Sequence, residues 1–515
     1  MSSSADYESC SDSCAINLLN SVLGAGTSRR VMGIAKPAPV PPASHLSLLA
    51  TLTIHPLHTT RVDKPDYLDV PSQALDYLRN LLALVGPLNA DFRTAFQFHH
   101  TARWNRRGGY HSHGNNSDAS EGDEDRDEDR LSGRLANQGS LWNRGQDFWS
   151  TLGWAFNCST LYPHRWRYWK VWLEFMLDVL ESDWNERERL DLEAHQAQGN
   201  AGDAPLTSRR ESIISMYMDQ QSGRRGSFKV IIKALLADGS SISSTSFREV
   251  FDKEPRGRKK ESKKRKREAL DLENDKFGDY FDDDSISSGA SEPPTPQKPR
   301  DQRKKTSFGS SHPGLVESIH LRLRLFKLLS LATYTLSQPR ELHELYDEFS
   351  AAIKLLPLEL FSLFVSQRTN PLLPETHVTI LKELFRLLLP ASHKDPGKVD
   401  PDGEATGSLS SLMLERCFVL HPANTAAIED NAKLSLVVES AIQLLWKCDS
   451  ITYTDDFMGA VEKGIAARET KTKKKRTGRG KTDPGDALAQ EVLSNSADRL
   501  RLLLGALEAT AEAET

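Results

Sequence analysis

A few residues in this sequence have types that could bind a cofactor, but their spacing does not fit. The run Gly24–Gly26 is similar to the start of a dinucleotide-binding loop. Arg29 stands where the third glycine belongs, and no strand pattern precedes the run. The sequence also lacks the phosphate-binding GxxxxGK[ST], the GxSxG turn and the HExxH helix. We therefore expect no bound cofactor.

Metal ligands are equally sparse. His111 and His113 lie in a Gly- and Asn-rich stretch, and Cys10 and Cys14 have no second cysteine pair nearby. Structural zinc requires four ligands at defined spacing, so we expect no metal site. The histidines at 99–100 and His164 are candidate acids or bases, but nothing in the sequence supplies a nucleophile or an oxyanion donor. We predict no catalytic residues. An enzyme whose site is assembled from dispersed residues is kept as a weakly supported alternative.

The most distinctive stretch lies between residues 141 and 190, which hold seven of the nine tryptophans. After Pro163 the apolar residues recur at helical spacing in two stripes, so the predicted helix must be covered on two sides. We assign six residues of this helix to the structural core: Trp166, Trp169, Trp172, Leu173, Met176 and Leu180.

A functional interpretation of the same helix competes with the core assignment. Arg165, Arg167 and Lys170 alternate with the tryptophans, and cations beside aromatic faces can stack bases, hold a methylated lysine or anchor a partner helix. The only polar row, however, is Lys170, Glu174, Asp178 and Glu181, and its carboxylates would repel a nucleic acid. The core interpretation is favoured.

A dense basic cluster lies between residues 256 and 267, where nine basic side chains accompany one glutamate. Such a cluster on an exposed segment fits the extended groove of an importin, which predicts a nuclear protein. It also predicts a non-specific contact with nucleic acid, shared by Lys471–Lys481. The predicted import residues are Arg256, Arg258, Lys259, Lys260, Lys263, Lys264, Arg265, Lys266 and Arg267.

Four residues match kinase motifs. Thr295 lies in PPTPQKPR, Ser212 and Ser227 follow paired arginines, and Ser120 precedes acidic residues. At Ser227 a phosphate would meet the free N–H groups of a predicted helix. The acidic and aromatic stretch 275–284, DKFGDYFDDD, is either plain linker or a short motif that folds onto a basic partner.

The composition indicates folded blocks diluted by charged linkers. Hydrophobic residues make up 38% and charged residues 27%, while the net charge of −5 hides an acidic run at 117–130 and the two basic runs. Five irregularly spaced cysteines argue against a disulfide framework. We expect no signal peptide, and the absence of a long apolar run predicts no membrane segment.

The order of these stretches predicts an all-α protein. It is expected to form an irregular helical-repeat (HEAT-like) superhelix or a multi-helix bundle in two blocks, with long disordered charged linkers. The predicted parts are a disordered tail at 1–40, N-terminal helices at 41–104, an acidic linker at 105–140, a Trp-rich helical block at 141–251, a linker with the basic cluster at 252–313, a C-terminal helical block at 314–469, a basic linker at 470–484 and a terminal helix at 485–510.

Together these features favour a nuclear, non-enzymatic scaffold or adaptor subunit of a chromatin-associated complex for histone modification, transcription or repair. Its partners would be other nuclear proteins and importin. The alternative is a nucleolar ribosome-biogenesis factor whose basic linkers contact pre-rRNA.

Overall fold

The structure is a computed structural model of the chain. It describes residues 4–31, 39–62, 67–99, 131, 135–136, 139–199, 205–221, 226–256, 313–366, 370–451, 453–473 and 484–514. Over these ranges the chain forms helices joined by turns and irregular segments, and it contains no β-strand. The all-α class is therefore confirmed. Most of the expected acidic linker, of the linker with the basic cluster and of the basic linker at 470–484 lies outside the described residues.

The N-terminal half contains eleven of the labelled helices. They are α1 (Ser4–Val31), α2 (Ala43–Leu52), α3 (Val70–Val85), α4 (Phe92–Ala95), α5 (Leu141–Arg144), α6 (Phe148–Leu161), α7 (Pro163–Ala197), α8 (Thr207–Arg210), α9 (Ile213–Asp219), α10 (Ser227–Leu235) and α11 (Ser241–Ser246). In α3 both ends have residues that commonly bound a helix: Pro71 lies in the first turn, and Gly86 follows the last residue with a φ of 85° that favours glycine.

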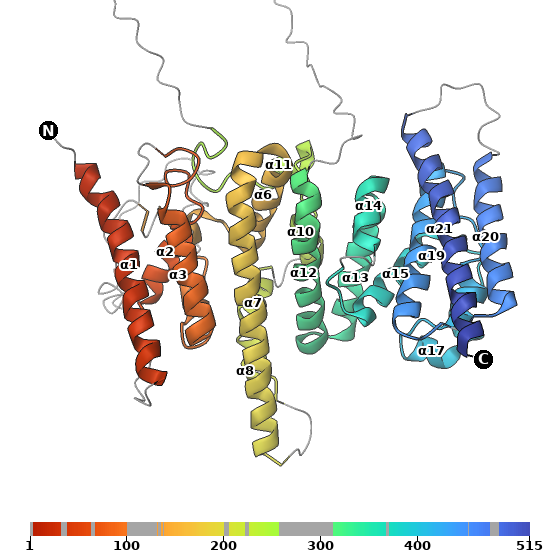
Figure 1. Cartoon of the computed structure of the whole chain (residues 1–515), viewed down its shortest axis with the longest axis horizontal. Helices are drawn as coiled ribbons and strands as arrows, with labels where there is room; N and C mark the ends of the chain where they lie inside the picture. The colour runs from red at the N-terminus through yellow and green to blue at the C-terminus, as the bar shows by residue number, and fades with distance from the viewer. Residues whose placement is uncertain are drawn as a thin grey trace, which may run out of the picture.

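The C-terminal half continues with α12 (Pro313–Leu336), α13 (Pro339–Lys354), α14 (Leu358–Val365), α15 (Pro374–Leu388), α16 (Pro396–Val399), α17 (Pro401–Ala405), α18 (Ser411–Met413), a π-helical segment (Leu414–Phe418), α19 (Ile428–Lys447), α20 (Asp455–Lys473) and α21 (Pro484–Glu514). Figure 1 shows the helices side by side along the long axis of the molecule, from α1 at one end to α20 and α21 at the other. Neighbours along this row are mostly neighbours in sequence.

The N-terminal segment differs from the flexible tail that we expected. Helix α1 packs on α3, and its side chains Ile16 and Leu23 are each only 2% exposed. The hydroxyl of Ser13 also donates a hydrogen bond to Oε1 of Gln73 in α3, at 2.8 Å. These contacts bury one stripe of an otherwise Ser- and Gly-rich helix. Its apolar side chains are too few to stand out by composition.

Nearly all the buried apolar residues of the described chain form one continuous cluster, from Ile16 in α1 to Leu507 in α21. Helix α12 begins the C-terminal half and packs on α6, α7 and α9 of the N-terminal half. The two halves therefore share a core, although residues 257–312 separate them in sequence.

Two arginines of α12 stabilise this contact between α12 and the N-terminal half, which we call the joint. Arg322 is fully buried, and its Nη1 and Nη2 donate to the backbone oxygens of Leu235 and Ala237 at 2.6 and 2.8 Å. Its guanidinium also lies 4.0 Å from the centre of the Phe156 ring. These two backbone oxygens lie at the end of α10, where helix carbonyls lack intrahelical donors, so Arg322 caps a helix of the other half.

Arg324 pairs with the polar row of α7. Its Nη2 contacts Asp178 at 2.9 Å and Glu181 at 2.6 Å. Two residues of the row that the sequence marks as the one polar side of this helix are thus paired with α12 and remain partly exposed. Helix α7 is accordingly packed on several sides, as its two apolar stripes require.

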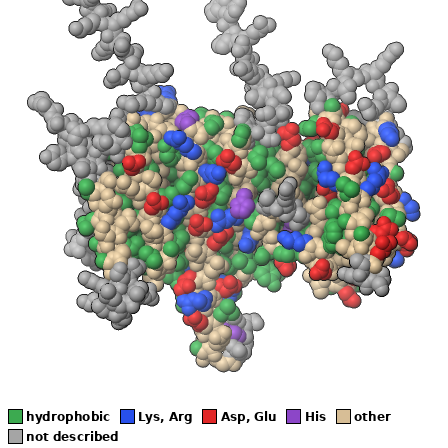
Figure 2. All heavy atoms as spheres, viewed as in Figure 1, with side chains coloured by type: hydrophobic (Ala, Val, Ile, Leu, Met, Phe, Trp, Pro, Cys, Tyr) green, Lys and Arg blue, Asp and Glu red, His purple; other side chains and the backbone are tan. Residues whose placement is uncertain are grey.

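The last part of α7 projects beyond the row of helices (Figures 1 and 2). It is braced by two carboxylates that are almost fully buried. Asp183 pairs with Arg187 at 2.9 Å and accepts the backbone N–H of Ile213 at 2.7 Å. Asp191 pairs with Arg209 at 2.9 Å and accepts the backbone N–H of Ser208. The projection is therefore fixed to the segment that returns through α8.

Candidate functional site

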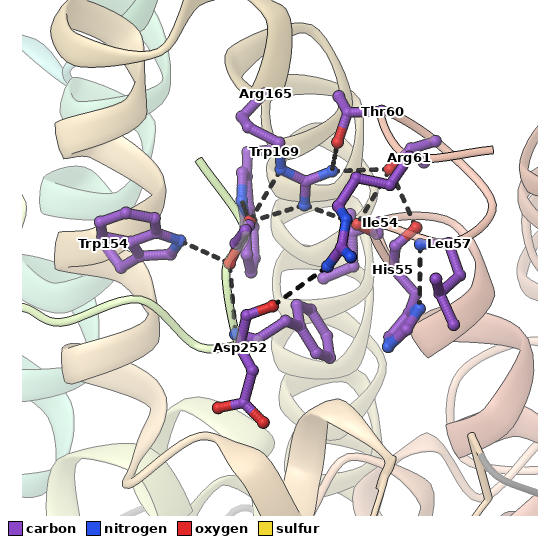
Figure 3. A network of polar contacts seen from close by, with 12 residues as sticks. Ile54, His55, Leu57, Thr60, Arg61, Trp154, Arg165, Trp169 and Asp252 are labelled. Atoms are coloured by element: carbon purple, nitrogen blue, oxygen red, sulfur yellow. Dashed lines mark hydrogen bonds and ion pairs between the residues drawn. The ribbon is translucent and has the colours of Figure 1, made fainter. Parts of the chain in front are cut away.

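One buried carboxylate, that of Glu254, joins three parts of the N-terminal half. Its side chain is fully buried. Oε1 accepts the indole N–H of Trp169 at 2.6 Å, and Oε2 accepts that of Trp154 at 2.9 Å. Oε2 also accepts the backbone N–H of Phe251 at 3.3 Å. Figure 3 shows the two indoles, from α6 and α7, pointing toward this centre.

Arg165 supplies the matching charge. Its Nε and Nη2 donate to Oε1 of Glu254 at 2.9 and 2.6 Å, and both side chains have an exposure of 0%. Nη2 also donates to the backbone oxygen of Ile54, and Nη1 to the hydroxyl of Thr59, each at 2.6 Å. A buried ion pair is stable only when such additional hydrogen bonds satisfy it. Here they tie the segment after α2 to α7 (Figure 3).

The surroundings of this pair favour neutral histidines. Burial lowers the pKa of His55 to about 3, and electrostatic repulsion from His58, Arg165, Arg144 and Arg61 adds to this effect when those groups are protonated. Burial alone lowers the pKa of His58 to about 4. Both rings are therefore uncharged at neutral pH. Neither has the pKa near 7 that general acid–base catalysis favours.

A second carboxylate, which follows the segment 257–312 in sequence, contacts the same part of α7. Oε2 of Glu317 in α12 accepts the indole N–H of Trp166 at 3.3 Å and pairs with Nζ of Lys170 at 3.2 Å. Three residues earlier, Gly314 packs closely on Trp166. A Cβ at Gly314 would lie 2.9 Å from Cδ1 of that indole and 2.4 Å from the backbone oxygen of Ser159.

We call this arrangement the clamp: Arg165, Trp166, Trp169 and Lys170 of α7, with Trp154, Glu254 and Glu317. Glu254 lies two residues before Arg256, the first residue of the basic cluster, and Glu317 lies four residues after Pro313. The clamp therefore holds both ends of the segment 257–312 on one turn of α7. Two of the three cations that alternate with the tryptophans, Arg165 and Lys170, therefore belong to the clamp. The third, Arg167, contacts Tyr168.

The structure buries all six residues that the sequence assigned to the core, with exposures from 0% to 4% (Trp166, Trp169, Trp172, Leu173, Met176 and Leu180). The three tryptophan rings among them are consequently not available to stack bases or to enclose a methylated lysine. The folded block also runs further than the expected boundary at residue 251, because Glu254 is part of the interior.

Most of the predicted import residues lie outside the described residues. Arg256 is described and exposed, and the other eight are not described. In the second basic run, Lys471 and Lys473 belong to α20. Nζ of Lys471 donates to the backbone oxygens of Ala423 and Asn424, so this side chain is engaged within the fold.

The kinase-motif residues fall into different environments. Ser120, Thr295 and the 275–284 stretch lie outside the described residues. Ser212 is fully buried, and its hydroxyl accepts the backbone N–H of Ser215 at the start of α9. Ser227 is the first residue of α10 and is partly exposed.

Among the described residues, one group has ligand atoms close enough for a metal ion: His343, Asp347 and Glu383. The guanidinium of Arg386 pairs with both carboxylates, contacting Glu383 at 2.7 Å and also Asp347. A cation would have to displace this arginine. The ion pairs explain the cluster without a metal.

Sequence reasoning missed Glu254 and Glu317. Their side-chain partners are at least 85 residues away, as in the contacts of Trp169 with Glu254 and of Trp166 with Glu317. No local spacing could identify them.

Comparison with family models, with curated proteins and with solved structures finds no match to this chain. None of the described helices combines the length and the apolar character that crossing a bilayer requires.

Proposed function

We propose that this chain is a nuclear, non-enzymatic scaffold or adaptor subunit of a chromatin-associated complex. It would act by binding and positioning other proteins, with its helices arranged as an irregular HEAT-like superhelix or bundle. In this proposal the basic cluster from Arg256 to Arg267 serves nuclear import through importin and contacts nucleic acid non-specifically, together with Lys471–Lys481.

The observation that carries the proposal is the clamp. It fixes both ends of the segment that contains the basic cluster on one turn of a buried helix, and the buried pair of Arg165 and Glu254 lies at its centre. Loops that are held by a rigid scaffold are common sites of recognition. The clamp tryptophans are used to hold the segment rather than to bind a ligand.

The charge distribution supports the same division of labour. On the face shown in Figure 2, basic and acidic side chains are interspersed over the folded body. Strong fields of one sign occur instead in the sequence runs 117–130, 256–267 and 471–481. A binding mode in which the body contacts proteins and the charged segments serve import and tethering fits this pattern.

Localisation of the tagged full-length chain tests the import step. Replacing the nine basic residues of 256–267 with glutamine should move the chain from the nucleus to the cytoplasm. The matched control replaces the basic residues in 474–481 with glutamine. This variant should keep more of the chain in the nucleus than the 256–267 variant does. Equal nuclear accumulation of the wild type and the 256–267 variant would contradict import through this cluster.

Affinity purification with mass spectrometry tests the scaffold. Partners that remain after nuclease treatment are expected for a protein-binding adaptor. The alternative, a nucleolar ribosome-biogenesis factor that contacts pre-rRNA through its basic segments, rests on the same charged runs. Nucleolar accumulation together with a partner list that is lost after RNase treatment would favour the alternative.

A further inference from the structure

A polar hollow of about 370 Å³ lies beside the clamp. It is formed where α5, the start of α6 and the end of α11 meet, and the segment 248–250 closes one side. That segment leads through Asp252 and Glu254 to Arg256. A molecule bound in the hollow would therefore lie close in sequence to Arg256, where the basic cluster begins.

The lining of the hollow offers more donors than the fold itself uses. Arg144 and Arg248 contribute guanidinium groups, and Gln146 and Ser150 contribute an amide and a hydroxyl. Arg144 uses Nη1 to contact Oδ2 of Asp252 at 3.0 Å, and that carboxylate is 81% exposed. Guanidinium groups bind phosphate well because their donors form a planar fork that matches its oxygens.

A third arginine, Arg61, lies close to the hollow. Nη1 of Arg61 donates to the backbone oxygen of Asp252, so Arg61 and Arg144 both contact this residue. Besides burial, Arg144 and Arg61, together with the more deeply buried Arg165, also lower the pKa of nearby His55. Glu249 is the one carboxylate in the lining. Two guanidinium groups against one carboxylate make an anion the ligand that this lining favours.

We propose that the hollow binds a backbone phosphate of a nucleic acid. The assignment rests on the tethering part of the proposed function, because the exposed Arg256 follows Asp252 by four residues, a span of at most about 14 Å in an extended chain. A polyanion with regularly spaced phosphates can occupy the hollow and the start of the basic cluster at once. A single phosphorylated side chain would use the hollow alone.

Fluorescence anisotropy with the full-length protein tests the assignment. The probes are a labelled 20-base-pair DNA duplex and a labelled single-stranded RNA of equal length, measured between 50 and 200 mM salt. The test variant is R144Q/R248Q. The control is R210Q/R340Q, which removes the same charge at two exposed arginines elsewhere in the fold. Thermal unfolding of each variant checks that the fold is intact.

Loss of one or two phosphate contacts should lower the slope of log affinity against log salt by about 1 to 2. R144Q/R248Q should show this loss and R210Q/R340Q should not. E249Q removes the carboxylate from the lining and should raise the affinity several-fold at 50 mM salt. Whichever probe binds more tightly identifies the type of nucleic acid.

Three results would overturn the proposal. They are equal salt slopes for the two double variants, no binding of either probe by the wild type at 50 mM salt, and displacement of the probe by a phosphoserine peptide at lower concentration than by unlabelled duplex. Failure here leaves the scaffold proposal separately testable, because import and nuclease-resistant partners do not depend on Arg144 or Arg248.

Discussion

Arg165 and Glu254 lie 89 residues apart in sequence, and they form an ion pair in which both side chains are fully buried. The glutamate is the last strongly held side chain before the basic cluster begins. Its two oxygens accept five hydrogen bonds from side chains and backbone. The stability of this turn of α7 and the position of the basic segment therefore depend on the same carboxylate.

Replacing Glu254 with glutamine should destabilise the protein strongly. The change leaves the guanidinium of Arg165 buried without a counter-charge, which typically costs about 3–5 kcal/mol. Urea unfolding measures the loss of free energy of unfolding. D252N is the matched control, because this neighbouring carboxylate is 81% exposed and its ion pair is worth about 1 kcal/mol or less. Equal losses for the two variants would show that Glu254 does not hold the clamp.

Two glycines of α20 should respond to alanine with opposite signs. At Gly464 a Cβ would lie 1.8 Å from the backbone oxygen of Val419, so G464A must move the backbone and should cost about 1–3 kcal/mol. At Gly459 nothing lies within 4 Å of the added Cβ. G459A should stabilise the protein by about 0.5–1 kcal/mol, because alanine loses less conformational freedom in a helix than glycine.

Thermal and urea unfolding of the two alanine variants separates these effects. The pair shares one helix and one chemical change, so a difference in sign isolates the close approach of α20 to the π-helical region. Destabilisation by G459A of the same size as that by G464A would mean that α20 does not pack against Val419 in this way.

The helical elements could be predicted because their signals are local. In α7 the tryptophans and leucines recur at helical spacing, and the expected helix after Pro163 is present, extended to Ala197. Helix α1 could not be predicted in the same way. Its burial depends on a few side chains, such as Ile16 and Leu23, that find their partners only when α3 lies beside them.

The clamp and the joint could not be predicted from the sequence, because their polar contacts join distant segments. Arg324 meets Asp178 and Glu181 across 146 and 143 residues. From the sequence these carboxylates belong to the polar row of α7, and nothing local identifies an arginine of α12 as their partner. Burial of a charge is decided by tertiary packing, which helical periodicity does not encode.

Acid should destabilise the protein through its buried histidines. Burial lowers the pKa of His58 to about 4 from the 6.5 of an exposed histidine. Between these pH values the unfolded chain binds a proton at this position that the folded chain does not. The free energy of unfolding therefore falls as the pH drops below 6.5, by up to about 1.4 kcal/mol per pH unit for this histidine, and the loss ends below pH 4.

Urea unfolding at a series of pH values between 7 and 4 measures this dependence. H58Q removes the titrating group and should flatten the curve by the contribution of one histidine. Parallel curves for the wild type and H58Q would mean that His58 binds its proton equally well in the folded chain.

Phosphorylation should distinguish two serines that share a kinase motif. Ser212 and Ser227 both follow paired arginines, but Ser212 is fully buried at the start of α9 while Ser227 is partly exposed at the start of α10. An arginine-directed kinase should therefore modify Ser227 in the folded chain. The phosphate would meet the positive end of α10, which has no side-chain cap, and should stabilise this helix by about 0.5–1 kcal/mol.

Peptide mapping by mass spectrometry after kinase treatment measures the two sites separately. S227A should remove the modification of the folded chain, while S212A should leave it unchanged. When the chain is unfolded in urea and digested to peptides before the kinase is added, both serines should be modified at similar rates, because only the fold protects Ser212. Rapid modification of Ser212 in the folded protein would mean that the segment around α9 opens readily, against the burial of its side chain and the hydrogen bond that its hydroxyl accepts from Ser215.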